Sequence, residues 1–578
     1  MMPTFKILFR EFFGQFFESE SVSSDLRLRQ AIIAVVAFLM APGMILAIQM
    51  YPTYQYTVRA APELVEPLTR QLTSLFLTFS TVSIGLISAL AWAALSFDRR
   101  DAMVLGPLPV SRATVVAAKL AALVVFLLGA CLPLNLVTAV PFSLVASGHK
   151  DLSGVAHHFI AHMVTTTWAA SCVFSAIVIL RGLLGMTTRG HLASALASLL
   201  QFVFVSALLC FFVLAPTMVT IDRRPQNAGI TISEIHMTAM PAWMPTRWFL
   251  PMYEQLRGTA YPGTRDVARR TAIATLAMVV GAIMITFAGY RRQLQLALTP
   301  PGSTGAIGGA RISRAVARAM LGPDRVAQAV SDFVLTTITR NRTQQAPIAI
   351  NAAIGLAMLI LGIARQRGGI GAVVHAPAFV LAVPLVLVFW ACIGLRASFF
   401  VPSELPASWS FRANAPAATS AYALGTRAAI VALVGPPAVL VALALATLIG
   451  GWLTAVFHAS FVLLLVVALA DFVVLTIGDI PFTHPYHPGH AKLKTRWPLY
   501  LFGAYGFGDG LASLELLFLN ERQAFVGVLG GAVMVVAIFE WAVRRAGRDW
   551  PKPSGEDEED AFSSVTVLHL ATGVPRQA

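Results

Sequence analysis

Charged side chains are scarce in this chain of 578 residues, of which only 12% are Asp, Glu, Lys or Arg. Soluble domains carry roughly 25%, so this composition cannot build a water-soluble surface. Hydrophobic residues make up 57% of the chain. They fall in long runs of the size that crosses a hydrocarbon layer of about 30 Å as a helix. The composition therefore predicts an integral membrane protein.

Sequence signatures of catalysis are also missing. The chain has no G-x-x-x-x-G-K-[ST] phosphate-binding loop and no G-x-S-x-G, H-E-x-x-H or C-x-x-C motif. The cysteines lie inside apolar runs, at no metal or redox spacing, so no disulfide framework is expected. They are Cys131, Cys172, Cys210 and Cys392. We predict that the chain is not an enzyme and holds no metal or cofactor of its own.

The long apolar runs predict an all-α membrane protein with about twelve transmembrane helices. Barrel strands would be about 10 residues long with alternating polarity, whereas these runs are long and apolar on all sides. The first run begins too late and is too long for a signal peptide. The predicted spans are residues 31–51, 72–97, 119–147, 157–181, 193–220, 271–290, 346–364, 376–397, 427–449, 452–476, 498–518 and 524–543.

The charge distribution predicts the orientation. The formal net charge is +14, and the short loops that carry Lys and Arg become cytoplasmic if the N-terminus is inside, as the positive-inside rule requires. Both termini are then cytoplasmic, in a bacterial cytoplasmic (inner) membrane. The basic residues are scattered between spans rather than gathered on one face, so the expected partner is the lipid bilayer and not nucleic acid.

The spans divide into two halves of six. The first half covers residues 1–290 and the second 346–545, joined by a basic cytoplasmic segment, 291–345. A tail, 546–578, contains the acidic run GEDEEDAF and is expected to be disordered.

Each half is preceded by a predicted amphipathic helix that should lie along the membrane surface. The apolar stripes are Phe5, Leu8, Phe9, Phe12, Phe13, Phe16 and Phe17 in the first, and Val326, Val330, Phe333, Val334 and Ile338 in the second. Two such openings are consistent with an internal repeat, as in many transporters, or with two unrelated surface helices.

The loop 97–120, between the second and third predicted spans, is the most informative segment. It begins with four charged residues, continues through an apolar stretch and two prolines, and ends with a basic residue at the next span. Its key positions are Asp98, Arg99, Arg100, Asp101, Leu105, Pro109, Ser111, Arg112 and Lys119. Proline fixes the chain direction, and the Ser111 hydroxyl can cap the following helix. The pattern predicts a short amphipathic element followed by a rigid turn.

This loop resembles the first cytoplasmic loop of the permease subunits of type-2 ABC exporters. The family pattern has an acidic-basic start, a leucine-rich turn, "LP-hydrophobic-SR" and a lysine, here Asp98–Asp101, Leu105, Leu108–Arg112 and Lys119. The resemblance implies a coupling helix that contacts a separate ABC ATPase subunit, which would bind ATP and magnesium. An ordinary positive-inside connection is the alternative.

Family chains commonly have six spans, so twelve would imply that one chain supplies both halves of the translocation unit. Whether it works with two ATPase subunits or as a homodimer stays open. The equivalent loop in the second half carries Glu404, Pro406 and Arg412, and Arg427 at the next span. It departs from the family pattern, so it is a weaker candidate for a second coupling loop.

Two other clusters of polar residues lie in the second half. Asp471 and Asp509 are candidates for lining a transport pathway, because charges inside spans usually face a cavity or pair with another group. His484, His487 and His490 lie three residues apart, but Pro485 and Pro488 exclude a regular helix that would stack them. We expect a rigid turn there rather than a zinc site.

Three functions are compatible with these patterns. The first is the permease of an ATP-driven exporter, and the second is a proton-coupled secondary transporter that uses Asp471 or Asp509. The third is a membrane enzyme acting on lipid or polyprenyl substrates through the outer loop 221–270. That loop contains Asp222, Glu234, His236 and Glu254. The sequence does not indicate the substrate.

Overall fold

The structure, a computed structural model, is helical apart from one two-stranded hairpin among the residues it describes. These are residues 2–16, 65–92, 94–97, 99–147, 152–187, 190–214, 219–226, 229–237, 245–259, 263–298, 308–365, 376–401, 403, 420–478, 480–483, 499–500, 502–519 and 521–550, with positions 43, 44, 48, 54, 55 and 59.

Eight helices in the described part of the chain are long and apolar enough to cross a membrane. They are α3 (Val65–Leu90), α5 (Arg112–Ala146), α6 (Leu152–Thr187), α9 (Thr264–Leu298), α12 (Arg342–Arg365), α14 (Pro377–Phe399), α16 (Ser420–Ile477) and α19 (Arg522–Ala546). The prediction of a helical, membrane-embedded protein is confirmed in this form, while the count of twelve spans stays a prediction.

The remaining predicted spans compare as follows. Helix α16 covers both 427–449 and 452–476, and its kink at Gly450 and Gly451 falls between them. Gly451 has a φ of 76°, which glycine adopts without a Cβ penalty. The predicted span 31–51 lies almost wholly outside the described residues.

Two predicted spans differ from the structure. Helix α7 ends at Leu214 after starting at Gly190, and the chain enters strand β1 at Val219, so the predicted end of the fifth span at residue 220 is wrong. Within the predicted eleventh span, a π-helical turn at Gly506–Gly510 leads into a short helix, α18 (Leu511–Leu519).

The chain forms two compact units. Unit 1 comprises Met1–Gly305 and Ala349–His375, and unit 2 comprises Ala306–Ile348 and Ala376–Ala578. The chain therefore passes between units inside helix α12. Most of the basic segment 291–345 belongs to unit 2, whereas most of the predicted seventh span packs with unit 1.

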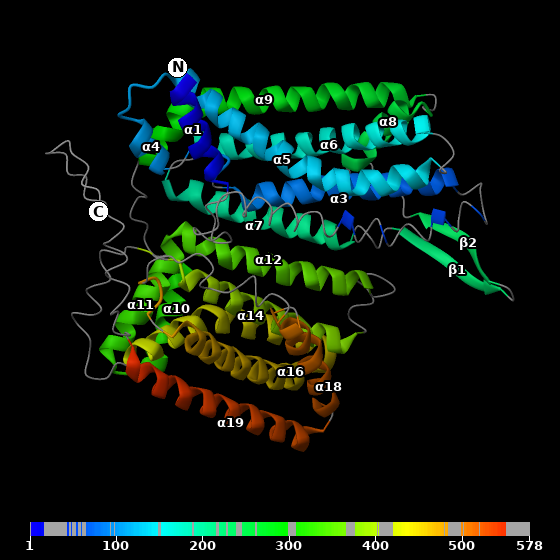
Figure 1. The fold of residues 1–578 in the computed structure, drawn as a ribbon. Coiled ribbons are helices and arrows are strands. Elements are labelled where there is room, and N and C mark those ends of the chain that lie inside the picture. The colour runs from blue at the N-terminus through cyan, green and yellow to red at the C-terminus, as the bar shows by residue number, and fades with distance from the viewer. Residues whose placement is uncertain are drawn as a thin grey trace, which may run out of the picture. The chain divides into compact units, whose positions relative to one another are not determined.

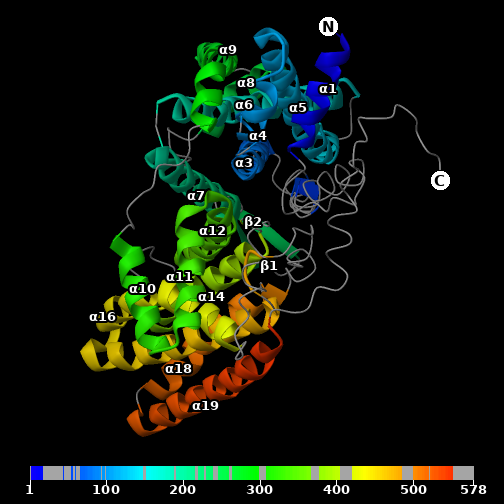
Figure 2. The same cartoon turned by 90° about the vertical axis from the view of Figure 1, so that its left-hand side faces the viewer.

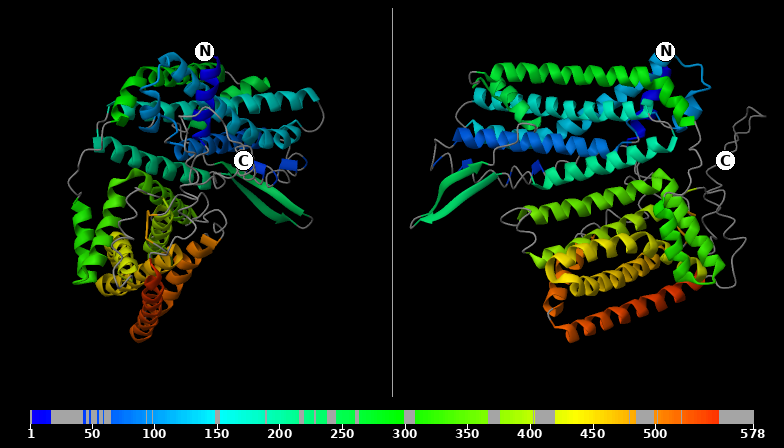
Figure 3. Two further views of the ribbon diagram at one scale, coloured as in Figure 1. Left: turned by 60° about the vertical axis from the view of Figure 1, so that its left-hand side comes forward. Right: turned by 180° about the vertical axis from the view of Figure 1, so that it is seen from behind.

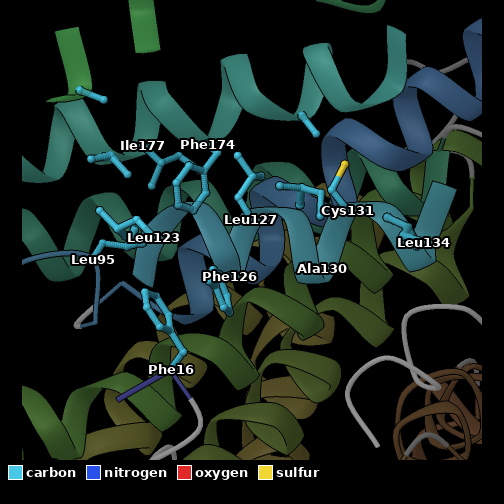
Figure 4. Close-up of a cluster of buried hydrophobic side chains, with 14 of the residues drawn as sticks. Phe16, Leu95, Leu123, Phe126, Leu127, Ala130, Cys131, Leu134, Phe174 and Ile177 are labelled. Atoms are coloured by element: carbon cyan, nitrogen blue, oxygen red, sulfur yellow. The ribbon is translucent and has the colours of Figure 1, made fainter. Parts of the chain in front are cut away.

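Unit 1 is built around α3, whose most apolar stretch is 83% buried. Helices α1 (Met2–Gly14) and α4 (Arg99–Leu105) lie at one end of its long helices, and α8 (Pro245–Arg257) lies at the other (Figure 1). Figure 4 shows the core near α1, where the Phe16 and Phe126 rings stack with centroids 4.1 Å apart. This contact ties the chain just after α1 to α5.

A β-hairpin occupies part of the predicted outer loop 221–270. Strand β1 (Val219–Gln226) pairs antiparallel with β2 (Gly229–Met237), with an irregularity between Asp222 and Arg223. The register places Asp222 opposite Glu234 and Thr220 opposite His236. We predicted no strand here, so the hairpin is an addition to the all-α fold.

In unit 2, α10 (Gly308–Leu321) and α11 (Arg325–Arg340) cross the end of the long helices α14, α16 and α19 (Figure 3). Figure 2 shows α10 and α11 lying alongside each other. Helix α11 packs so closely on α16 that a Cβ at Gly425 would overlap the Ala327 backbone. Gly425 therefore permits the close approach of the two helices.

The apolar stripes predicted for the two amphipathic helices face protein. On α1, Leu8 and Phe12 are buried, as is Phe16 just beyond its end, and on α11, Val330 and Val334 are buried. Helix α1 packs on α5, and α11 packs on α16. Their stripes thus anchor the helices to their own units, and their position at a membrane surface stays a prediction.

Candidate functional site

The loop that resembles a coupling helix forms a helix, a turn and a capped helix start. Helix α4 spans Arg99–Leu105, and α5 begins at Arg112. Ser111 has extended backbone angles, and its Oγ accepts a hydrogen bond from the Thr114 backbone N–H at 3.2 Å. This confirms the predicted N-cap, which gives α5 a fixed starting point after the turn.

Lys119 is fully buried near the start of α5, although lysine is rarely buried without partners. Its Nζ donates to Gln15 Oε1 at 2.9 Å and lies 4.7 Å from the centre of the Phe12 ring. The Phe97 ring centre is 5.6 Å away. The aromatic faces attract the ammonium group, so its charge is partly compensated inside the protein.

Gln15 links Lys119 to the loop. Its Nε2 donates to Asp101 Oδ1 at 2.8 Å while its Oε1 accepts from Lys119. A side-chain amide can do both because it carries an acceptor and two donors. The structure therefore brings the predicted Asp101 and Lys119 together through Gln15, a residue outside the apolar stripe of the first helix. Asp101 is itself 5% exposed.

Arg112 fixes the other side of the turn to α9. Its guanidinium lies 4.4 Å from the centre of the Phe287 ring and 6.0 Å from that of Tyr290, and it donates to the Phe287 carbonyl. Arginine stacks well on aromatic rings. Arg112 therefore serves as an internal anchor here. The sequence could not identify its partners, since they lie far along the chain.

The opposite surface of the loop is exposed and apolar. Met103 and Val104 on α4 are 54% and 55% exposed, and Leu108 in the turn is 47% exposed. Pro109 is also exposed, whereas Leu105 is buried. We call Met103, Val104 and Leu108 the loop patch. Arg99 and Arg100 belong to α4, but their side chains, like all of Asp98, lie outside what the structure describes.

The second candidate loop lies outside the described residues, and with it Glu404, Pro406 and Arg412. The histidines His484, His487 and His490 also fall outside them. Their flanks are described: Phe482 donates its backbone N–H to Phe399 O at 3.0 Å, and Ser403 donates to Phe482 O at 3.2 Å. The ends of these two segments therefore lie side by side in unit 2.

The two predicted pathway residues have different environments. Asp471 is fully buried, with Oδ1 2.6 Å from Arg427 Nε. Arg427 also lies 3.5 Å from Glu540, which pairs with Arg544 at 2.7 Å. Asp509 is exposed on the π-helical turn. Asp471 thus belongs to an ion-pair cluster, which supports the local-pairing alternative over a shared lining.

A second buried pair in unit 2 was not predicted. His458 Nδ1 lies 2.9 Å from Glu515, and both side chains are fully buried. No sequence spacing links Glu515 to a residue 57 positions away. Arg396 is also buried and donates to Thr476 Oγ1 at 3.0 Å and Tyr500 OH at 3.1 Å.

The opposite end of unit 1 carries two ion pairs that attach α8 to α3. Glu254 lies 2.6 Å from Arg70, and Arg257 lies 2.5 Å from Glu66. Burial raises the pKa of Glu254 above its usual value, against the lowering effect of Arg70. Burial also raises the pKa of Tyr253, whose hydroxyl is 2.7 Å from His158 Nδ1. Glu254 was one of the candidate residues for an enzymatic site in 221–270. Its carboxylate pairs with Arg70 instead.

The comparisons with known proteins add no relative: no protein-family model, curated protein or solved structure matches this chain.

Proposed function

We propose that this chain is the membrane-spanning permease of an ATP-driven exporter and that a separate ATPase subunit docks on α4 and the turn after it. The observation that carries the proposal is the two-sided construction of this loop. Its inner side is anchored through Asp101, Gln15, Lys119 and Arg112, while the loop patch is exposed. A contiguous exposed apolar patch is typical of a contact with a protein or a membrane, and the charged residues at the start of α4 favour a protein here.

The anchoring provides a route for mechanical coupling. A push on α4 would reach α1 through Gln15, α5 through Lys119, and α9 through Arg112, because each contact joins the loop to a different helix. Rigid elements joined by such contacts move together. ATP binding and hydrolysis on the partner would then reorient the helices of unit 1 and expose a site alternately on each side of the membrane.

The first test is to place charge on the loop patch. The double variant Met103→Asp/Val104→Asp should abolish co-purification of the proposed ABC ATPase subunit with this chain, and transport with it. Both side chains are more than half exposed, so the fold should survive. The matched control is Trp248→Asp/Leu256→Asp, which charges exposed apolar residues on α8 at the other end of unit 1. Equal loss in both variants, or none in the first, contradicts the proposal.

The basic residues of the loop need separate tests, because Arg112 is an internal anchor. Replacing Arg99 and Arg100 by Gln should reduce ATP-dependent transport while leaving thermal stability unchanged. Replacing Arg112 by Gln should lower stability as well, since it removes the stacking on Phe287. Unchanged transport in the Arg99→Gln/Arg100→Gln variant would count against docking at α4.

The proton-coupled carrier remains the alternative, and unit 2 supplies its test. A carrier driven by Asp471 or Asp509 loses coupling to the proton gradient when either is neutralised. In an ATP-driven permease, Asp509→Asn should leave transport unchanged, because Asp509 is exposed on the π-helical turn.

A further inference from the structure

Helix α10 leaves an apolar stripe uncovered, whereas its neighbour α11 buries the corresponding stripe. Ser313 and Ala317 face the protein and are buried, whereas Ile312 is 62% exposed and Met320 is 43% exposed. Ala315 and Ala319 are exposed as well. Residues 312, 315 and 319 are three and four positions apart, so they form one stripe along the helix.

A stripe of arginines runs beside it. Arg311, Arg314 and Arg318 have the same spacing of three and four positions, which places them on the neighbouring edge of α10. Arg318 pairs with Asp332 at 2.7 Å. Asp324 is also engaged, since its side chain caps α11 by accepting from Val326 N and Ala327 N. Among the described residues, no carboxylate pairs with Arg311 or Arg314.

The position of α10 decides what can cover these stripes. Helices α10 and α11 cross the end of α14, α16 and α19, which are helices long and apolar enough to span a membrane (Figure 3). A helix across the end of a membrane bundle lies at the depth of the lipid headgroups. Helix α11 buries its own stripe on α16, and α10 contacts both of these helices. The stripe of Ile312, Ala315 and Ala319 and the exposed Arg311 point away from the protein, while Arg314 is half-buried at the edge of the helix.

We propose that α10 is a binding site for anionic phospholipid headgroups. The stripe of Ile312, Ala315 and Ala319 would lie at the boundary of the acyl chains. Arg311 and Arg314 would contact the lipid phosphates, as in amphipathic surface helices with one basic edge. Arginine suits this role because its fork binds phosphate in a bidentate way. The proposal depends on membrane embedding and not on the exporter assignment.

The test measures phosphatidylglycerol bound to the full chain, purified in detergent, by native mass spectrometry, with phosphatidylcholine as the neutral comparison. A basic residue near an anionic surface strengthens binding roughly fivefold. Arg311→Gln/Arg314→Gln should therefore weaken phosphatidylglycerol binding about tenfold or more and leave phosphatidylcholine binding unchanged.

The matched control is Arg269→Gln/Arg270→Gln, which makes the same charge change on two exposed arginines at the start of α9. It should lower phosphatidylglycerol binding less than twofold. Equal effects of the two variants would show only general charge attraction and would overturn the proposal.

A second measurement tests the apolar stripe directly. Ile312→Cys, labelled with an environment-sensitive fluorophore in a Cys172→Ser background, should be quenched by doxyl-labelled lipid in nanodiscs containing phosphatidylglycerol. The other three cysteines are buried and should not react. A label at 312 that lipid does not quench would show that water or protein covers α10, and the proposal would fall.

Discussion

Each unit has a basic residue near the start of one long helix, and the partners of these two residues differ. Lys119 and Arg427 each lie seven positions beyond the first residue of their helix, Arg112 in α5 and Ser420 in α16. In each unit an amphipathic helix packs on that long helix. Lys119 contacts Gln15 at the end of α1 and two aromatic rings. Arg427 instead contacts two carboxylates, Asp471 and Glu540.

The two sets of contacts have different effects. We call a contact that holds one bundle together a lock, in contrast to a contact that connects separate elements and can transmit movement. The Lys119 contact joins α5 to α1 and, through Gln15, to the loop that begins with α4, so it can transmit movement at the end of unit 1. The Arg427 contacts join the start of α16 to its own second half and to α19, which holds the bundle of unit 2 together. We therefore expect changes at Arg427 to affect stability most and changes at Lys119 to affect coupling.

The largest expected effect is the removal of Asp471. In Asp471→Leu, the mostly buried charge of Arg427 has only the half-buried Glu540 to balance it. Breaking one side of a buried pair costs about 3–5 kcal/mol. Unfolding by SDS in mixed micelles measures this loss.

The control for that variant replaces both partners. Asp471→Leu/Arg427→Met should recover most of the lost free energy of unfolding, because an apolar pair of similar volume avoids the cost of desolvating two charges. If the double variant is as unstable as the single one, the pair is not the lock and the contrast between the units fails.

The comparison also shows how far the sequence could predict this molecule. Most of the long apolar helices were predictable, because runs such as 119–147 are long enough to cross a membrane wherever they fold. The sequence could not predict that two spans join inside α16. Two glycines such as Gly450 and Gly451 fit a loop as well as a kink in one helix. Short Arg- and Ala-rich helices such as α10 give no long apolar run, and α10 was missed.

The candidate site was predictable only in part. Ser111 was recognised as a cap because its hydroxyl acts on a backbone group three residues away. The contacts of Lys119 with Gln15 and of Arg112 with Phe287 join residues more than a hundred positions apart, and no local pattern encodes them. No local pattern encodes the contact between Arg427 and Asp471 either, and sequence analysis noted these two residues separately.

An intermediate effect is expected at Lys119. Lys119→Met keeps the volume and removes the hydrogen bond to Gln15 and the attraction of Phe12 and Phe97. A hydrogen bond to a charged group contributes about 1.5–3 kcal/mol, part of which methionine recovers by avoiding the burial of a charge. We expect a small loss of stability and faster proteolysis near α1. Gln15→Leu should reproduce the faster proteolysis. If Lys119→Met is as unstable as Asp471→Leu, then Lys119 also holds its unit together and is a lock.

The smallest effect is expected at the ion pair of unit 1 that most resembles the one at Arg427. Arg70 is 45% exposed although Glu254 is 1% exposed, and exposed partners are screened by water, so this pair contributes little. Because burial raises the pKa of Glu254 in the folded protein, the folded state binds a proton there more tightly than the unfolded state does. Its contribution is therefore most favourable below the unfolded pKa and is lost as the pH rises through the folded one.

Glu254→Gln removes this titration. The melting temperature of the natural chain minus that of Glu254→Gln, measured by intrinsic fluorescence between pH 4 and pH 8, should fall as the pH rises, with Arg247→Gln as the control on the same helix. A difference that increases with pH would mean that Arg70 outweighs burial and lowers the pKa of Glu254. The pair in unit 1 would then act as a second lock, and the contrast between the units would be limited to the end that carries Lys119.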